Sequence, residues 1–405
     1  MARTIFAFNG DLESRLALHW LANELGHQVI ALSINLGQEE HLQSLGELAL
    51  ELGAIAAQVV DGREMFVNQF ALPLLQAGGV YQQSCYLGSA LARYVIAQEM
   101  VQLAKEEGCT TVAHSAAGKG NDQVRMETAI AALDPDLTVL APVRKWNLQS
   151  LEHKIEYAQR HRIPIKEVAS SIVTKDRNLW GVSHYLHGLT DAWTVPPDDF
   201  FVLTQAPEQA PDEPTMLTFR FESGVPTHLN EQEYDLISLI RELTRVGGLH
   251  GVGRCDVVED RLFGIKSREF YEAPAPFILH MAYRELESLV QSRELRQFKE
   301  VLSRRYAEMA YIGLWFNDLR RALDGFFQTT QSHVTGEVRI KLSKGLATAV
   351  GRRSPFSLYD SRLANQSNLD MFDNQWAQGF TSLWTLSSRM AARNQRAAEG
   401  ESEEL

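Results

Sequence analysis

Two short polar segments hold the residues best suited to chemistry. The first, Asn9-Gly10-Asp11-Leu12-Glu13-Ser14-Arg15, separates the apolar run 4–8 from a helical pattern that begins near Leu16. A strand, a tight turn and a helix start together form a phosphate site, because free N–H groups of the first helical turn attract an anion. Only Gly10 is small, and Asp11 and Glu13 add two carboxylates. The geometry therefore predicts phosphate binding, whereas the charges oppose it.

The second polar segment, residues 115–125, follows the apolar run 110–114 and reads Ser-Ala-Ala-Gly-Lys-Gly-Asn-Asp-Gln-Val-Arg. Short polar groups crowded at a strand-to-helix turn suit a small zwitterion, because a carboxylate can hold an ammonium while Arg and amide groups hold a carboxylate. The alternative is a solvated loop in which Asn or Asp caps the next helix.

Alternating strands and helices position these two segments. Strands are expected at residues 4–8, 29–34, 54–60, 110–114 and 137–141, and helices at 41–52, 64–75, 87–105 and 148–161. Repeated units of this kind imply a parallel sheet covered on both faces, with ligands at the carboxyl ends of its strands. Both polar segments lie at such ends.

The pattern changes near residue 169. Residues 194–214 contain five prolines and several acids with little periodicity, which predicts an exposed, irregular excursion. Hairpins are expected at 216–229 and 338–351, and helices at 231–246, 277–290 and 293–309. This second part is therefore predicted to be α+β with antiparallel strands.

Two further stretches of the second part favour binding or assembly. Residues 251–261 and 266–272 alternate charged with strand-forming residues, which indicates either the wall of a cleft or the exposed charges of surface strands. The apolar stripe of a helix over 374–393 has little left to cover, so we expect an oligomerisation arm followed by a frayed acidic tail, 399–405.

Composition limits the classes of protein that remain. A chain of 405 residues is expected to form two domains with an appendage. The net charge of −12 argues against nucleic-acid or anionic-membrane partners, and no apolar stretch is long enough to span a membrane. Three widely spaced cysteines fit reduced thiols and give no metal-binding pattern. A cytoplasmic protein with no metal-ligand residues of its own is the resulting expectation.

Several ordered multi-residue runs resemble the argininosuccinate synthase family over essentially the whole chain. The runs are Leu36-Gly37-Gln38-Glu39-Glu40, Leu87-Gly88-Ser89-Ala90-Leu91-Ala92-Arg93, Gly118-Lys119-Gly120-Asn121-Asp122-Gln123-Val124-Arg125, His250-Gly251-Val252-Gly253-Arg254, Gly264-Ile265-Lys266-Ser267-Arg268 and Ser357-Leu358-Tyr359-Asp360. The family joins citrulline to aspartate with ATP: the ureido oxygen takes AMP, pyrophosphate leaves, and the aspartate amine then displaces AMP.

The resemblance implies an α/β fold with three parts. Residues 1–168 would form a Rossmann-like, parallel-sheet nucleotide-binding domain of the PP-loop (adenine-nucleotide α-hydrolase-like) type, and residues 169–365 an α+β synthetase domain. Residues 366–405 would be the C-terminal arm helix and tail, through which the family forms homotetramers.

The resemblance also assigns binding residues by motif. The citrulline site would consist of Tyr81, Asn121, Arg125, Thr174, Ser183, Glu259 and Tyr271, where Thr174 replaces a family serine. The aspartate site would consist of Ala117, Asn121 and Asp122, where Ala117 replaces a threonine. No single residue is marked as catalytic.

The nucleotide loop departs most from the family pattern, which is Ser-Gly-Gly-Leu-Asp-Thr-Ser. The ATP site, with Mg²⁺ as companion ion, would consist of Ala7, Asn9, Gly10, Asp11, Leu12, Glu13, Ser14, Arg15, Ile34 and Ser115. Asp11 replaces the second glycine and sets a carboxylate against the polyphosphate, and the change also removes a residue suited to left-handed backbone. Arg15 replaces a serine, and it either supplies a cation or fills the phosphate volume.

Two functions follow from these observations. The first is an ATP-dependent ligase that joins citrulline, or a similar ureido amino acid, to aspartate or another amine. The second is a catalytically impaired paralogue that keeps the fold and the amino-acid pocket and acts as a binding or regulatory protein.

Overall fold

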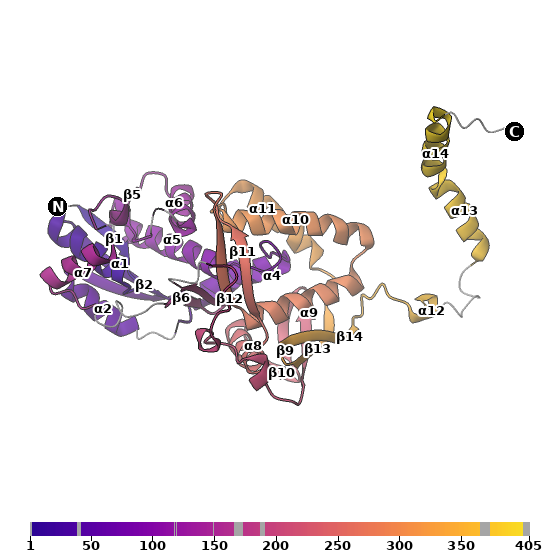
Figure 1. Cartoon of the computed structure of the whole chain (residues 1–405), viewed down its shortest axis with the longest axis horizontal. Helices are drawn as coiled ribbons and strands as arrows, with labels where there is room; N and C mark the ends of the chain where they lie inside the picture. Colours follow the sequence, from indigo (N-terminus) through magenta and orange to yellow (C-terminus); the bar gives the residue numbers. More distant parts are fainter. Residues whose placement is uncertain are drawn as a thin grey trace. The chain divides into compact units, whose positions relative to one another are not determined.

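The computed structural model describes residues 2–38, 42–116, 118, 120–148, 150–165, 173–186, 191–364 and 373–399 (Figure 1). The chain divides into two compact units, residues 1–356 and 357–405. The larger unit contains both predicted polar segments.

A five-stranded parallel sheet forms the N-terminal half of the larger unit. Its order is β3-β2-β1-β4-β5, with β1 (Arg3–Ala7) in the middle. The other strands are β2 (Gln28–Asn35), β3 (Ala56–Asp61), β4 (Thr111–Ala113) and β5 (Thr138–Leu140). Because β1 is covered on both faces, Ile5 and Phe6 are both fully buried and belong to different clusters of the core.

Helices cover both faces of this sheet, as the repeated pattern predicted. One face packs on α1 (Leu12–His19), α2 (Leu42–Glu51) and α7 (Leu151–Arg160) through Leu16, Ala49 and Ala158. The other face packs on α5 (Gly88–Glu106) and α6 (Asn121–Leu133). Both polar segments therefore meet the carboxyl edge of the sheet, after β1 and after β4 (Figure 1).

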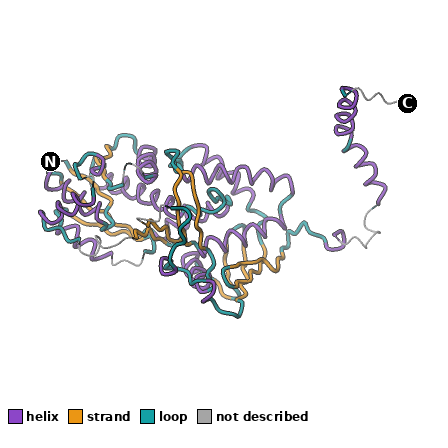
Figure 2. The backbone as a smooth tube through the Cα atoms, in the orientation of Figure 1, coloured by secondary structure: helices purple, strands orange, loops and turns teal. Residues whose placement is uncertain are grey.

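Antiparallel sheets make up the second half of the unit, as predicted (Figure 2). A four-stranded sheet has the order β11-β12-β7-β6, and its strands are β6 (Val173–Asn178), β7 (Gly181–Leu186), β11 (Arg254–Asp260) and β12 (Lys266–Glu272). A five-stranded sheet has the order β10-β9-β8-β13-β14, and its strands are β8 (Thr215–Glu222), β9 (Val225–Leu229), β10 (Gln232–Glu233), β13 (Gly336–Ser343) and β14 (Leu346–Arg353). The helices of this half are α8 (Leu236–Leu249), α9 (Pro274–Val290), α10 (Arg293–Tyr311) and α11 (Asp318–Thr330).

Four local features differ from the sequence expectations. The β6–β7 hairpin and α11 were not predicted. The helix expected at 64–75 is α3 (Arg63–Met65), the π-helical η2 (Phe66–Ala71) and α4 (Leu72–Gln76). The helix expected at 374–393 breaks at Thr385 into α13 (Asn374–Trp384) and α14 (Leu386–Ala398).

The excursion at 194–214 is irregular, as predicted, but only partly exposed. It contains two short 3₁₀ turns, Asp198–Phe200 and Pro207–Gln209. The backbone N–H groups of Val202, Leu203 and Thr204 donate to the carboxylate of Glu272 at 2.8–2.9 Å. Most of the segment is exposed, as predicted, but the part around Thr204 is buried because a carboxylate on β12 binds its main chain.

The smaller unit contains α12 (Ser361–Ala364), α13 and α14. Its large apolar side chains are exposed: Trp376, Phe380, Leu383 and Trp384 each retain 61–72% of their accessible surface. None of the described helices is long and apolar enough to cross a bilayer.

Candidate functional site

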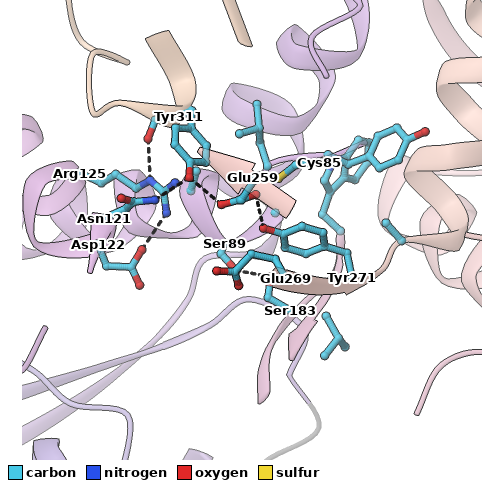
Figure 3. A pocket seen from close by; sticks show the side chains of 18 of the residues that line it. Cys85, Ser89, Asn121, Asp122, Arg125, Ser183, Glu259, Glu269, Tyr271 and Tyr311 are labelled. Atoms are coloured by element: carbon cyan, nitrogen blue, oxygen red, sulfur yellow. Dashed lines mark hydrogen bonds and ion pairs between the residues drawn. The ribbon is translucent and has the colours of Figure 1, made fainter. Parts of the chain in front are cut away.

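A cavity of about 220 Å³ lies where the two halves of the larger unit meet (Figure 3). Its wall combines the start of α5, the start of α6, strand β7, the β11–β12 hairpin and the end of α10. The charged residues 251–272 thus supply part of a cavity wall, through Glu259, Arg261 and Glu269.

Glu259 on β11 is the central acceptor of this cavity. The hydroxyl of Tyr271 donates to its Oε2 at 2.7 Å, and the hydroxyl of Tyr311 donates to its Oε1 at 2.6 Å (Figure 3). Burial raises the pKa of Glu259, while these two hydrogen bonds oppose the rise. Each oxygen keeps further lone-pair capacity, so the carboxylate can accept N–H groups from a ligand.

Arg125 and Asp122, both on the first turns of α6, form the charged side of the cavity. Arg125 Nη1 lies 2.9 Å from Asp122 Oδ1, and Arg93 Nη2 lies 2.9 Å from Asp122 Oδ2. Burial raises the pKa of Asp122, but the two guanidinium groups outweigh it and leave the pKa below its ordinary value. Asp122 is therefore an ionised carboxylate at neutral pH.

Asn121 is held from two sides at the N-terminus of α6. Its Nδ2 donates to the Tyr311 hydroxyl at 2.8 Å, and its Oδ1 accepts the backbone N–H of Leu262 at 3.1 Å. Ala116 and Gly120, which precede it in the chain, also line the cavity. The polar segment after β4 therefore lines a binding cavity and is more than a helix cap.

The remaining polar lining comes from β7, α5 and β12. Ser183 Oγ lies 2.9 Å from Ser89 Oγ, and Arg261 Nη2 lies 2.6 Å from Glu269 Oε1. Cys85 also lines the cavity, but burial raises the pKa of its thiol to about 12, so it is a neutral group and no thiolate nucleophile.

The structure brings most predicted amino-acid-binding residues together. The predicted residues that line the cavity are Asn121, Asp122, Arg125, Ser183, Glu259 and Tyr271. Tyr81 lies behind this lining, where its ring stacks on Tyr311 and its hydroxyl donates to the Asp260 carbonyl at 2.9 Å. Thr174 is in β6, but its side chain lies outside the described set, as does the whole of Ala117.

Sequence reasoning missed Tyr311, Ser89, Arg261 and Glu269 as parts of this cavity. The last two belong to the charged stretches, whose alternation gave a partial signal. Tyr311 ends a long helix beside Gly313, and an aromatic residue at a helix end gives no distinctive pattern.

The loop after β1 forms the predicted strand–turn–helix. Gly10 has φ +76, a left-handed conformation that favours glycine, and its missing Cβ leaves room for the side chain of Leu45. Asp11 has φ −69 and ψ 171 as the N-cap of α1. The concern that Asp11 replaces a left-handed glycine is therefore not supported, because the left-handed residue is Gly10.

Asp11 engages one of the N–H groups at the start of α1 that could otherwise bind an anion. Its Oδ1 accepts the backbone N–H of Ser14 at 2.7 Å, and its Oδ2 accepts the Asn9 amide at 2.8 Å. Burial and the nearby Glu13 raise the pKa of Asp11. The amides of Leu12 and Glu13 have no partner among the described residues, so two N–H groups remain for a phosphate.

The other two charges of the loop are engaged. Arg15 Nε donates to the Gly10 carbonyl at 2.5 Å, and its Nη1 donates to the Pro164 carbonyl. Glu13 pairs with Lys154 of α7 at 2.5 Å. Arg15 thus ties the loop to the segment that follows α7.

Ala7, Ile34 and Ser115 come from three neighbouring strands. Ala7 ends β1, Ile34 lies near the end of β2, and Ser115 follows β4. All three lie at the carboxyl edge, beside the loop, as expected of a nucleotide site in an open parallel sheet.

The cavity and the loop define a class of protein. A parallel α/β domain has backbone N–H groups available to an anion at a helix start, and a cavity of the same unit contains carboxylates, an amide and a guanidinium, which suit an amino acid. This combination is that of an enzyme that brings a nucleotide to an amino acid.

Comparisons with known proteins specify the family. Residues 3–164 match the arginosuccinate synthase N-terminal HUP domain, and residues 173–391 match the arginosuccinate synthase C-terminal domain. The argininosuccinate synthase of Geobacillus thermodenitrificans is 46% identical over 388 residues, which are 96% of this chain and 95% of that protein. The argininosuccinate synthase of Symbiobacterium thermophilum is 44% identical over 395 residues, 97% of this chain and 98% of that protein. The chain belongs to the argininosuccinate synthase family, a family of carbon–nitrogen ligases.

Proposed function

We propose that this chain joins citrulline to aspartate with ATP and releases AMP and pyrophosphate. The observation that carries the proposal is the polar cavity around Glu259, in which six residues predicted to bind the two amino acids lie together. Glu259 suits the N–H groups of a ureido side chain, and Arg125 suits an α-carboxylate.

The proposed reaction has two steps. The ureido oxygen of citrulline attacks the α-phosphorus of ATP, and pyrophosphate leaves. The amine of aspartate then attacks the ureido carbon, and AMP leaves with the ureido oxygen. Asn121 and Asp122 line the cavity at the start of α6, the helix that follows β4, which suits aspartate binding there.

ATP would bind at the carboxyl edge of the parallel sheet. Gly10 permits the left-handed turn before α1, and the Leu12 and Glu13 amides would hold phosphate oxygens. Mg²⁺ would accompany the nucleotide as its counter-ion. Among the described residues, no group of three or more His, Cys, Asp or Glu side chains could hold a metal ion.

Pyrophosphate release tests this function. The enzyme should release pyrophosphate over many turnovers only when ATP, citrulline and aspartate are all present. Replacing aspartate by other amines in the same assay defines the breadth of the second substrate. Arg125→Lys is the informative variant, because it keeps the charge and loses the planar fork that fits a carboxylate. Absence of pyrophosphate with every amine would refute the proposal.

The nucleotide loop favours a second candidate, the impaired paralogue that binds an amino acid without turnover. Its supporting observation is that Asp11 already accepts one N–H group of α1. Under this candidate the wild type binds citrulline but not ATP, and Asp11→Gly with Arg15→Ser creates ATP binding. An unchanged lack of affinity in that double variant would place the defect elsewhere.

Assembly and compartment extend the same proposal. We propose a homotetramer held by residues 366–405, because α13 carries an exposed apolar stripe. Cys85, Cys109 and Cys255 are free thiols, which is consistent with the cytoplasm. We also propose that the domain boundaries lie near residues 168 and 365.

A further inference from the structure

Tyr311, the last residue of α10, lines the cavity and is only 1% exposed. Its ring stacks on that of Tyr81, with centroids 3.7 Å apart and planes 8° from parallel. The guanidinium of Arg125, a residue of α6, lies over the same Tyr311 ring, with its central carbon 4.7 Å from the ring centroid. One aromatic side chain therefore contacts two predicted citrulline-binding residues through its ring.

The hydroxyl of Tyr311 joins two more of these residues. Its O–H group donates a hydrogen bond to Glu259 Oε1 at 2.6 Å, and its oxygen accepts a hydrogen bond from Asn121 Nδ2 at 2.8 Å (Figure 3). A carboxylate has no proton to give, and the amide nitrogen is only a donor, so the direction of both bonds is fixed. With Leu262 holding Asn121 Oδ1, the second N–H of the Asn121 amide remains for a ligand.

The main chain of Tyr311 is also fixed. Arg125 Nε donates to the Tyr311 carbonyl at 2.8 Å. Two residues later, Gly313 has φ +97, and a Cβ there would lie 3.3 Å from the Val124 carbonyl oxygen. The end of α10 thus packs closely on α6, so the position of Tyr311 is set by the helix that carries Asn121 and Arg125.

We propose that Tyr311 is a positioning residue of the amino-acid site, which holds Asn121 and Glu259 in the orientation that receives the ureido amino acid. The inference rests on the proposed function only where it names citrulline as the ligand. Tyr311 acts through these two side chains and is separate from the residues predicted by motif.

The carboxylate of Glu259 gives this role a signature that a purely structural role lacks. The groups that face it are Tyr271 and Glu269 of β12, Arg125 of α6, Tyr311 of α10, and Tyr81 and Cys85 of the segment before α5. The Tyr311 hydrogen bond opposes the burial that raises the pKa of Glu259. Without this hydrogen bond the pKa of Glu259 should rise further. The loss of citrulline affinity at low pH, which we call the acid limb, should therefore move to higher pH.

Tyr311→Phe tests the proposal, because it removes one hydroxyl and keeps the stacked ring. Tyr306→Phe is the matched control, since Tyr306 lies on the same helix, is fully buried and donates to Asp324 at 2.8 Å outside the cavity. Citrulline binding is measured by calorimetry without ATP, as a function of pH. Tyr311→Phe should weaken binding roughly ten- to a hundredfold and shift the acid limb upward, while Tyr306→Phe should keep wild-type binding.

Wild-type affinity and an unshifted acid limb in Tyr311→Phe would overturn the inference. Glu259→Gln gives a second test that does not depend on the folding of Tyr311→Phe, because the acid limb should vanish in it; a retained limb would also overturn the inference. Combined with Tyr311→Phe, Glu259→Gln should show strongly non-additive losses.

The failure of the inference is distinguishable from that of the proposed function. A wild type that binds citrulline with this dependence on Tyr311 but releases no pyrophosphate would refute the reaction and support the inference. A wild type that releases pyrophosphate, together with an unaffected Tyr311→Phe, would refute the inference alone.

Discussion

The carboxylate of Asp11 lies at the start of α1, where a bound phosphate would place its own negative charge. A contact between like charges in a partly buried site can cost several kcal/mol of binding free energy. Because about 1.4 kcal/mol corresponds to a tenfold change in affinity, Asp11 could weaken nucleotide binding by more than tenfold. The same carboxylate stabilises the helix as its N-cap, so Asp11 contributes to folding while it opposes nucleotide binding.

Asp11→Asn should raise ATP affinity by about tenfold, because asparagine caps a helix as well as aspartate does but has no charge. Since the pKa of Asp11 is raised, the wild-type carboxyl loses its charge at a higher pH than an ordinary aspartate. The difference between wild type and variant should therefore shrink as pH falls through that raised pKa. Calorimetric titration with ATP at several pH values measures this. Equal affinities at neutral pH would show that Asp11 does not limit binding.

Asp122→Asn should destabilise the protein by about 2 kcal/mol at neutral pH, because it leaves Arg93 and Arg125 without their shared carboxylate. The folded-state pKa of Asp122 is depressed, so its contribution is complete above the unfolded-state pKa and is lost as pH falls through the folded-state value. Denaturant unfolding should show the gap between wild type and variant closing in acid. A gap that persists there would contradict the ion-pair account.

At the scale of elements, the β6–β7 hairpin brings Ser183 to the cavity and depends on a close approach to β12. Gly181 begins β7 with φ +141, and a Cβ there would lie 2.3 Å from the Glu272 carbonyl oxygen. Ser183 pairs with Tyr271 across the same two strands. The geometry of this part of the cavity therefore depends on a residue without a side chain.

Gly181→Ala should lower the free energy of unfolding by about 2 kcal/mol or more and weaken citrulline binding, since β7 must move away from β12. Gly264→Ala is the matched control. Its φ is +74 and no atom lies within 4 Å of the added Cβ, so only the cost of left-handed backbone, about 1 kcal/mol, should appear. Equal effects of the two substitutions would mean that the close approach of the strands is unimportant.

The parallel half of the fold was predictable because buried strands leave continuous apolar runs in the sequence. Residues 4–8 and 29–34 correspond to β1 and β2, and the polar segments after the strands gave the edge at which the site lies. The β6–β7 hairpin was missed because Thr174, Asp176 and Ser183 break its apolar alternation. Tyr311 was missed because its importance arises from contacts with residues far away in sequence, such as Asn121 and Glu259.

At the scale of the whole molecule, α13 and α14 expose an apolar stripe that the other described residues of the smaller unit do not cover. Contiguous exposed aromatic and aliphatic side chains mark an interaction surface. Homotetramer formation by residues 366–405 stays a prediction, and the stripe indicates where to test it.

Phe380→Glu with Leu383→Glu should reduce the proposed tetramer to a smaller species, because each charge would be buried in an apolar contact. Gln378→Glu, on the same helix and also exposed, should leave the assembly unchanged. Light scattering coupled to size exclusion measures both. An unaltered mass in the double variant would assign assembly to another surface.

The fate of the ureido oxygen tests the central claim most directly. With citrulline labelled by ¹⁸O in the ureido group, together with ATP and aspartate, AMP should carry one ¹⁸O atom, because the oxygen that attacks the α-phosphorus leaves with AMP. Mass spectrometry of the AMP formed measures this. AMP without the label, or no AMP above the amount formed without citrulline, would contradict the account.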